Sequence, residues 1–284
     1  MAEDKPKDEQ LLTNPLPDDF RMYSVTTILG ALDKPALIYW AATETAKAAV
    51  SAAKSLPIRV EEDGPEATVK WLEDARFRRP RGLRSATELG TAVHDALEQL
   101  ALTGKFPEVD DEVRPFIEKA DAWMQKFQPV YQASELTVYS PNYGFAGTLD
   151  AIATIDGIRF IIDYKTSRKS FDNRGKPTSP YPEQVGLQLA AYRFSQYAAT
   201  WRPRRYEHMR RRYYLLGTDE RETAVPVPEV DMGLVLHLTP EHCEAYPINC
   251  DEKAFDAFLF TLECYRWINE TSKTVMGQPL IAPQ

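Results

Sequence analysis

Asp150, Asp163 and Lys165 are the residues whose types and spacing point most directly to chemistry. Asp156-Gly157 stands between the two acids, and an Asp-Gly pair between β-rich runs favours a two-residue type I′ turn, because glycine tolerates a positive φ. That turn fixes the register of a hairpin in which Asp150 faces Asp163, with Cβ atoms about 4.5–5.5 Å apart. Lys165 projects from the same face. Two opposed carboxylates repel each other, so this face predicts a divalent cation bound by oxygen ligands and supplemented by a lysine.

The other face of the same hairpin is apolar, which predicts that it is the buried side of the sheet. Its members are Leu149, Ala151, Ala153 and Ile155 on one strand and Ile158, Phe160, Ile162 and Tyr164 on the other. An alternative interpretation places the two aspartates on a solvated outer face with Lys165 as an ordinary surface partner, because exposed strand faces often carry charges.

Four short motifs that follow one another in the chain resemble the core of the PD-(D/E)XK nuclease superfamily and, more narrowly, its RecB/AddB-like exonuclease branch. They are Gly90-Thr91-Ala92-Val93-His94, Gly147-Thr148-Leu149-Asp150, Asp163-Tyr164-Lys165-Thr166 and Gln188-Leu189-Ala190-Ala191-Tyr192. In that branch the histidine stands on a helix before the hairpin, and the Gln-x-x-x-Tyr pair stands on the helix after it. The resemblance covers residues 87–197, and residues 23–29 and 34–37 are in addition similar to phage-encoded members.

The resemblance implies a set of metal ligands and the kind of metal. Asp150 and Asp163 would be ligands, with His94 as a third and the backbone carbonyl of Tyr164 as a fourth, and the ion would be Mg²⁺ or Mn²⁺. Without the other motifs, His94 would be interpreted as an ordinary core or surface histidine. Two further acids could stand in an outer shell around these ligands, Glu98 and Glu135.

The same resemblance gives catalytic roles to Lys165, Gln188 and Tyr192. Lys165 would position or activate the attacking water and would offset the charge that develops on the scissile phosphate. Gln188 and Tyr192 lie one helical turn apart and would orient Lys165 or contact the DNA backbone. The alternative is that these two residues form a helix flank that packs on the sheet.

The chain carries a net charge of −8, but its basic residues are unevenly distributed. Two arginine clusters with interleaved aromatic residues predict a surface that binds the phosphates of DNA, because the guanidinium group suits bidentate phosphate contact. Their members are Arg76, Arg78, Arg79, Arg81 and Arg84 in the first cluster and Arg202, Arg204, Arg205, Arg210, Arg211 and Arg212 in the second. The alternative for either cluster is a solvated charged face.

These features predict a metal-dependent DNA exonuclease that hydrolyses phosphodiester bonds in recombination, repair or phage DNA processing. One alternative is an endonuclease or a flap or branch nuclease on the same fold. Another is a non-catalytic DNA-binding subunit that recruits a helicase or recombinase. Because the chain has no Gly-x-x-x-x-Gly-Lys-Ser/Thr motif, its expected partners are DNA and a separate helicase or a single-strand annealing or recombinase protein.

The cysteines argue against an iron–sulfur cluster. Relatives that hold such a cluster use one cysteine upstream of the core and three close together downstream. Here Cys243, Cys250 and Cys264 are widely spaced and no cysteine lies upstream. An odd number of cysteines does not describe a disulfide framework either, so we expect a reducing, cytoplasmic setting.

Positioning these residues requires a sheet with helices around it. The apolar periodicity predicts helices over 35–55, 65–76, 87–102, 111–127, 183–197 and 251–268, and strands over 135–140, 144–155, 158–166, 233–238 and 244–248. This order predicts an α/β fold with a restriction-endonuclease-like core, in which helices flank a central mixed sheet, and with a helical N-terminal elaboration.

The composition limits the organisation of the chain. Its 284 residues are 43% hydrophobic, enough for a sizeable core. No apolar run approaches the roughly 18 residues that span a bilayer, and no secretory signal is evident, so no membrane partner is expected. We expect a mobile acidic tail over 1–20 and a single nuclease domain over 21–284. That domain would comprise the elaboration (21–86), the catalytic core (87–200) and C-terminal strands with a helix (201–284).

Overall fold

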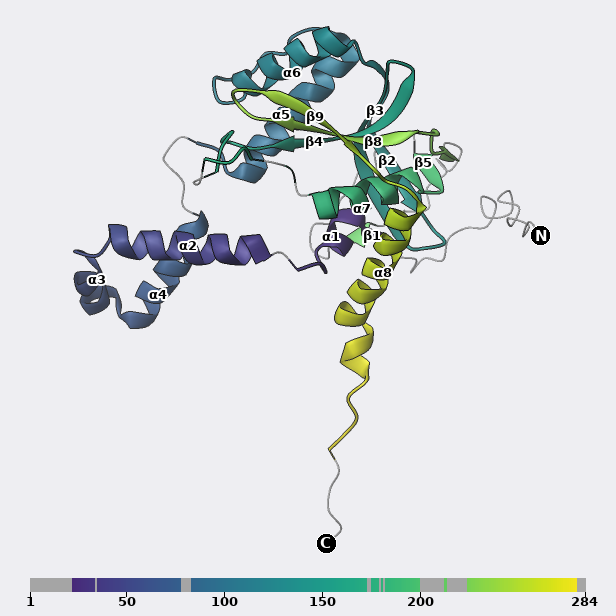
Figure 1. Ribbon diagram of the computed structural model, residues 1–284. Helices are drawn as coiled ribbons and strands as arrows, with labels where there is room; N and C mark the ends of the chain where they lie inside the picture. Colours follow the sequence, from purple (N-terminus) through teal and green to yellow (C-terminus); the bar gives the residue numbers. More distant parts are fainter. Residues whose placement is uncertain are drawn as a thin grey trace.

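The computed structural model describes residues 22–33, 35–77, 83–172, 175–178, 180, 182–199, 212–213 and 224–279; the expected tail over 1–20 lies outside these ranges. Figure 1 shows the described elements around one central sheet. In chain order they are β1 (Met22–Ser24), α1 (Val25–Leu29), α2 (Pro35–Ser51), α3 (Leu56–Asp63), α4 (Pro65–Glu73), η2 (Asp74–Phe77), α5 (Ala86–Thr103), α6 (Arg114–Phe127), β2 (Val130–Ser140), β3 (Phe145–Ile155), β4 (Ile158–Thr166), α7 (Pro182–Arg193), β5 (Tyr197–Ala199), β6 (Arg212–Tyr213), β7 (Ala224–Pro226), β8 (Met232–Leu238), β9 (Cys243–Ile248), α8 (Glu252–Asn269) and η4 (Thr271–Thr274).

The strands of the described ranges form one mixed sheet. Seven of them follow the order β7-β5-β2-β3-β4-β8-β9, while β1 pairs with β3, and β6 pairs with β1. Neighbours run antiparallel except for β4 with β8 and β1 with β3, which are parallel. A parallel pair needs a long connection, and α7 lies in the connection between β4 and β8. The fold is therefore mixed α/β, with a mixed sheet flanked by helices.

The β3–β4 hairpin has the turn and the register that its sequence predicts. Asp156 and Gly157 both have a positive φ, 50° and 81°, as a type I′ turn requires. Backbone pairing runs from Ile155↔Ile158 to Ala151↔Ile162. It stops one step before Asp150 and Asp163, so the two acids stand where the strands part.

Helices cover both faces of the sheet, so the expectation of a single buried face is wrong. α5 and α6 pack on one face, together with Ala151, Ile162 and Tyr164 (Figure 1). α1, α7 and α8 cover the other face, where Leu149 and Ile161 are fully buried. Leu149 and Ala151 thus belong to different faces although simple alternation would place them together, which shows that the alternation of β3 breaks at Asp150.

α5 forms where the apolar spacing predicts it and holds the first of the four motifs. Leu89, Val93 and Leu97 are buried against the sheet. Its start is fixed by a capping box, in which the side chains of Ser85 and Glu88 each accept a backbone N–H of the other residue. These contacts set the axial position of the whole helix, and with it the position of the motif's histidine.

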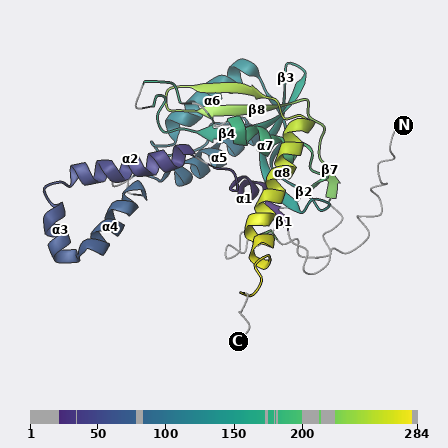
Figure 2. The same ribbon diagram turned by 60° about the horizontal axis from the view of Figure 1, so that its bottom comes forward.

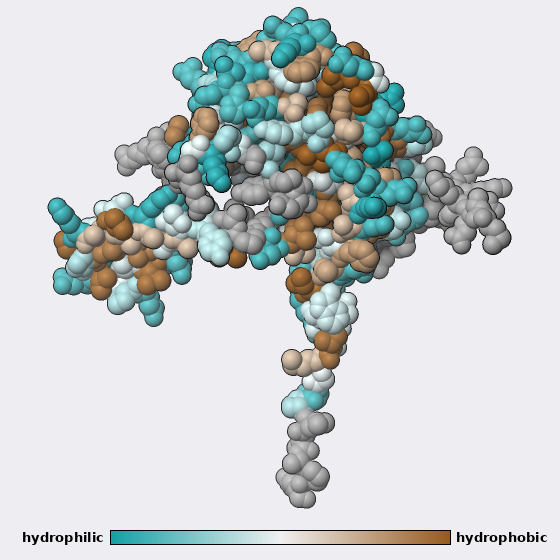
Figure 3. Space-filling view, in the orientation of Figure 1, coloured by the Kyte–Doolittle hydropathy of each residue, from teal (hydrophilic) through white to brown (hydrophobic). Residues whose placement is uncertain are grey.

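α2, α3 and α4 form a helical arm that projects from the sheet and its covering helices (Figures 1 and 2). Large apolar side chains stay exposed on the arm, among them Val50, Ile58 and Val69. Figure 3 shows such apolar side chains on the arm's surface. Helices were expected in most of this segment, whereas α3 was not.

The segment after α7 differs from its expected structure. The helix expected over 183–197 ends at Arg193, and Tyr197 lies instead in β5, paired with Tyr139 of β2 and Pro226 of β7. Sheet pairing on both sides outweighs the helical propensity of this segment, because tertiary contacts routinely override weak local preference. None of the helices in the described ranges combines the length and apolar character that crossing a bilayer requires.

Candidate active site

Asp150 closes the open end of the β3–β4 hairpin. Its Oδ2 accepts the backbone N–H of Tyr164 at 2.6 Å, so the carboxylate replaces a backbone acceptor where the ladder stops. The Asp150 side chain is only 13% exposed. The alternative of a solvated outer face is therefore wrong for this residue.

His94 reaches the same point from α5. A carbonyl oxygen only accepts hydrogen bonds, so His94 Nε2–H donates to the Tyr164 carbonyl, at 2.9 Å. The other ring nitrogen, Nδ1, faces Asp150 Oδ1 at 3.6 Å. Both backbone polar groups of Tyr164 thus fix the site, the N–H holding Asp150 and the carbonyl holding His94.

Asp163 is almost completely buried, at 2% exposure, and is engaged through both oxygens. Lys165 Nζ lies 2.6 Å from its Oδ2, and Gln188 Nε2–H donates to its Oδ1 at 2.9 Å. A buried carboxylate needs such compensation. The structure thus brings Lys165 and Gln188 together on Asp163, as the sequence resemblance implies for orientation of the lysine.

Tyr192 and Gly147 connect two of the motifs by direct packing. Tyr192 is 3% exposed, and its Oη lies 3.4 Å from Gln188 Nε2. A Cβ placed on Gly147 would lie 2.5 Å from Tyr192 Cε1, closer than carbon atoms approach. The glycine is therefore required so that the tyrosine ring can lie on β3, beside Gln188.

Glu135 joins the site from β2 and was expected only as an outer-shell acid. Its neighbours pair with β3 as Ser134↔Ala151 and Leu136↔Leu149, which places Glu135 opposite Asp150. Ligand atoms of His94, Glu135 and Asp150 lie within 4.8 Å of one another. The available signal was positional: Glu135 begins the predicted strand that precedes the Asp150 strand.

The electrostatics of the site centre on Asp150. Burial raises its pKa to about 7, and the nearby Asp163 raises it as well, while His94, the Tyr164 N–H and Lys165 act in the opposite direction. Without a cation, the ionised form of Asp150 is therefore disfavoured at neutral pH. A perturbed carboxyl beside a histidine and a lysine is typical of functional sites.

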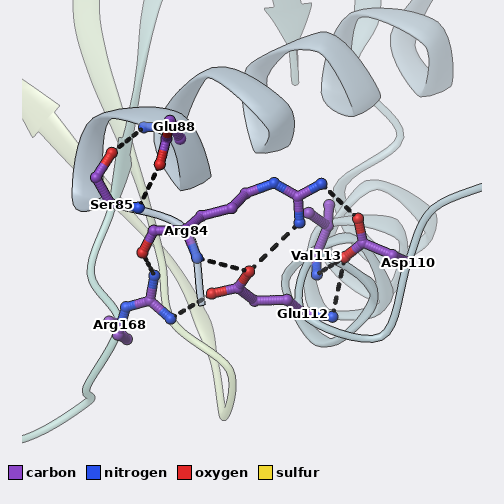
Figure 4. A network of polar contacts seen from close by, with 7 residues as sticks. All are labelled: Arg84, Ser85, Glu88, Asp110, Glu112, Val113 and Arg168. Atoms are coloured by element: carbon purple, nitrogen blue, oxygen red, sulfur yellow. Dashed lines mark hydrogen bonds and ion pairs between the residues drawn. The ribbon is translucent and has the colours of Figure 1, made fainter. Parts of the chain in front are cut away.

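Arg84 belongs to an ion-pair network that ties the start of α5 to α6 and to the segment after β4 (Figure 4). Its guanidinium lies 2.6 Å from Asp110 and 3.4 Å from Glu112. Arg168 contacts Glu112 at 2.5 Å and donates to the Arg84 carbonyl at 2.8 Å. The Asp110 contact raises the pKa of Arg84, and Arg168 lowers the pKa of Glu112. The charge of Arg84 is thus compensated within the protein, a structural role that sequence reasoning missed.

Most of the other arginines of the two clusters lie outside the described residues. Arg76 lies in η2 and Arg212 in β6. Those outside the described residues are Arg78, Arg79, Arg81, Arg202, Arg204, Arg205, Arg210 and Arg211. Their contact with DNA stays a prediction.

The three cysteines lie on separate elements: Cys243 in β9, Cys250 before α8 and Cys264 in α8, and all three are free. Burial raises the pKa of Cys243 to about 12. Within the described residues, no cysteine belongs to a group of three potential metal ligands.

Comparisons with known proteins add little to this geometry. No protein-family model matches the chain, and no curated protein matches it. Chains of solved structures do match. One, described as the crystal structure of SSO0001, is 14% identical, with a TM-score of 0.37, over 93% of this chain and 82% of that chain. A likeness of this strength carries no argument about function.

Proposed function

We propose that this protein is a Mg²⁺- or Mn²⁺-dependent DNA exonuclease built on a restriction-endonuclease-like core. The observation that carries the proposal is the convergence of His94, Asp150, Asp163 and Lys165 at the open end of one hairpin. Three acidic or imidazole groups with a lysine beside them match the needs of phosphodiester hydrolysis, which are a held cation and a positive supplement.

The donor set fits such a cation. Mg²⁺ has ligands at about 2.1 Å, so two ligands on opposite sides of it lie about 4.2 Å apart. His94 Nδ1 and Asp150 Oδ1 lie 3.6 Å apart, within that span, so one cation can contact both. A ligating histidine usually donates its other ring N–H to a carbonyl or carboxylate, as His94 donates to Tyr164.

Four groups would hold the ion: Asp150, Asp163, His94 and the Tyr164 carbonyl. Each carboxylate oxygen has two lone pairs, so Asp163 can hold Lys165 and still bind a cation. When bound, the cation supplies Lewis acidity towards the scissile phosphate.

Lys165 would act on the substrate from a fixed position. Asp163 holds its ammonium at 2.6 Å, and the Lys165 side chain remains 35% exposed, which leaves it accessible to a phosphate or a water. Gln188 fixes Asp163 from α7, and Tyr192 lies against Gln188. In this arrangement Lys165 is the catalytic residue, while Gln188 and Tyr192 are positioning residues.

The test is digestion of end-labelled linear DNA and of covalently closed single-stranded circles, with Mg²⁺, Mn²⁺ or EDTA. We expect metal-dependent loss of the linear DNA and intact circles. Cleavage of circles would assign an endonuclease, and DNA binding without any cleavage would assign a non-catalytic subunit that acts with a helicase or recombinase.

Variants link the activity to the site. Lys165→Ala, Asp150→Ala and Asp163→Ala should each lower cleavage by about 10²-fold or more, since each removes a charge that acts on the transition state. Lys169→Ala is the matched control, because Lys169 is an exposed lysine on the same exit from β4. Wild-type cleavage rates in both aspartate variants would indicate that the active site lies elsewhere in the protein.

A further inference from the structure

Glu135 has a backbone conformation that its side chain does not favour. It lies within β2 yet has a φ of +50°, a left-handed value that non-glycine residues rarely adopt and that asparagine or aspartate adopts more easily than glutamate. The strand pairs normally on either side of it. The effect is local: the backbone turns at the single residue of β2 that stands opposite Asp150.

His94 and Asp150 face each other without a direct contact. The Tyr164 carbonyl accepts a hydrogen bond from His94 Nε2–H, which orients the ring so that Nδ1 faces Asp150 Oδ1, 3.6 Å away. That distance is too long for a hydrogen bond. A cation that contacts both atoms fits this separation, because two ligands of one ion lie up to about 4.2 Å apart.

Asp163 is engaged differently from Asp150. Its two oxygens face Lys165 and Gln188, and it does not belong to the close cluster formed by His94, Glu135 and Asp150. Within the described residues, Glu135 is therefore the carboxylate best placed to complete the ligand set of His94 and Asp150.

We infer that Glu135 is a direct metal ligand of the same ion as His94 Nδ1 and Asp150, and that this site binds Mn²⁺ more tightly than Mg²⁺. The inference rests on the proposed metal dependence and names a residue that the family resemblance does not. The preference follows from chemistry, because Mg²⁺ favours oxygen ligands alone, whereas an imidazole nitrogen is better suited to a transition-metal ion.

The experiment measures Mn²⁺ affinity by calorimetric titration at pH 8, without DNA, for wild type, Glu135→Gln and Glu118→Gln. Glu118 is the matched control, since it is an exposed glutamate on α6 and lies outside the ligand cluster. We expect Glu135→Gln to weaken Mn²⁺ binding at least about tenfold and Glu118→Gln to change it less than twofold. Competition in the wild type should show Mn²⁺ binding at least about tenfold tighter than Mg²⁺.

Glu135→Gly is a second variant that distinguishes loss of a metal ligand from loss of folding. Glycine adopts a positive φ without strain, so this variant should unfold no earlier than wild type in EDTA and should still lose Mn²⁺ affinity. Wild-type Mn²⁺ affinity in both Glu135 variants would overturn the inference.

The outcomes separate this inference from the proposed function. If Mn²⁺ binding depends on Glu135 but no DNA is cleaved, the inference about the metal site holds and the proposed nuclease function is wrong. If cleavage depends on metal but Mn²⁺ affinity is unchanged in Glu135→Gln and Glu135→Gly, the proposed nuclease function holds and Glu135 is not a metal ligand.

Discussion

At Asp150, burial makes the ionised carboxylate costly in the absence of a cation. Its pKa in the folded protein, about 7, lies above the ordinary value of 3.8. The folded state therefore holds a proton between about pH 4 and 7 that the unfolded chain has released, and stability falls as pH rises through this window. The neutral form can still accept the Tyr164 N–H, which keeps the hairpin end intact.

Asp150→Asn should remove this pH-dependent loss. In EDTA the variant should come within about 1 kcal/mol of wild type at pH 4 and exceed it at pH 8 by up to about 4 kcal/mol, since each pKa unit corresponds to about 1.4 kcal/mol. Urea unfolding of both proteins at the two pH values measures the difference.

The comparison variant is Asp163→Asn. It removes the buried carboxylate charge that pairs with Lys165, whose side chain is 35% exposed, so we expect it to destabilise the protein at both pH values. If Asp150→Asn is instead less stable than wild type at pH 8, the buried, ionised Asp150 carboxylate does not lower the stability of the metal-free protein.

The residues of the four motifs were the easiest part of the candidate site to predict. His94, Asp150, Asp163, Lys165 and Gln188 were named from motifs, and the structure brings them together. Glu135 could be named only as a distant candidate. Its place depends on how β2 pairs with β3 around one left-handed residue, and no local preference of a glutamate predicts that conformation.

At the scale of elements, β3 and α7 meet through one glycine. Gly147→Ala would place a Cβ 2.5 Å from the ring of Tyr192, and the buried ring has little room to move. We expect a loss of about 1–3 kcal/mol of stability, as for overpacked cores. Cleavage should also fall, because the displaced ring disturbs Gln188 and, through it, Asp163 and Lys165. Urea unfolding and cleavage rates check this.

Gly186→Ala is the control on the same helix. A Cβ there meets no atom closer than 3.7 Å, and alanine favours a helix over glycine by about 1 kcal/mol. This variant should be at least as stable as wild type and fully active. Equal behaviour of the two glycine variants would remove the positioning role of Tyr192.

Elements defined by nearby residues were predicted well, and those defined by distant pairing were not. α5 and the β3–β4 hairpin follow from apolar spacing and an Asp-Gly turn within a few residues. β5 exists because three residues after α7 pair with β2 and β7, and β1 because Tyr23 pairs with Phe145. Such pairings leave no periodic pattern in a segment of three residues.

At the scale of the whole molecule, charge is divided between segments. The arm together with η2, residues 35–77, has seven acidic and five basic residues, a net charge of −2. The second arginine cluster, with six arginines, is the stronger candidate for DNA contact. Neutralising Arg210, Arg211 and Arg212 together should weaken DNA binding and flatten the slope of log K against log salt by up to about 3, near one per lost phosphate contact.

Binding assays over a range of salt concentrations test this, with the arm variant Lys47→Gln, Lys54→Gln, Lys70→Gln as the control that removes the same charge. The control should keep the wild-type slope. Equal slopes in all three proteins would indicate that these arginines lie on a solvated charged face and do not contact the DNA phosphates.

The parallel pairing of β4 with β8 has a consequence for the order in which the molecule is made. Asp163 lies beside Val235 and Lys165 beside His237, so the strand that flanks the candidate site leaves the ribosome long after His94, Asp150 and Tyr192. Until then β4 is an edge strand with unpaired backbone groups, which invites aggregation. A nascent chain therefore contains every residue of the candidate site before β8 is available to complete the sheet around that site. We therefore expect fragments that end before β8 to be inactive and insoluble.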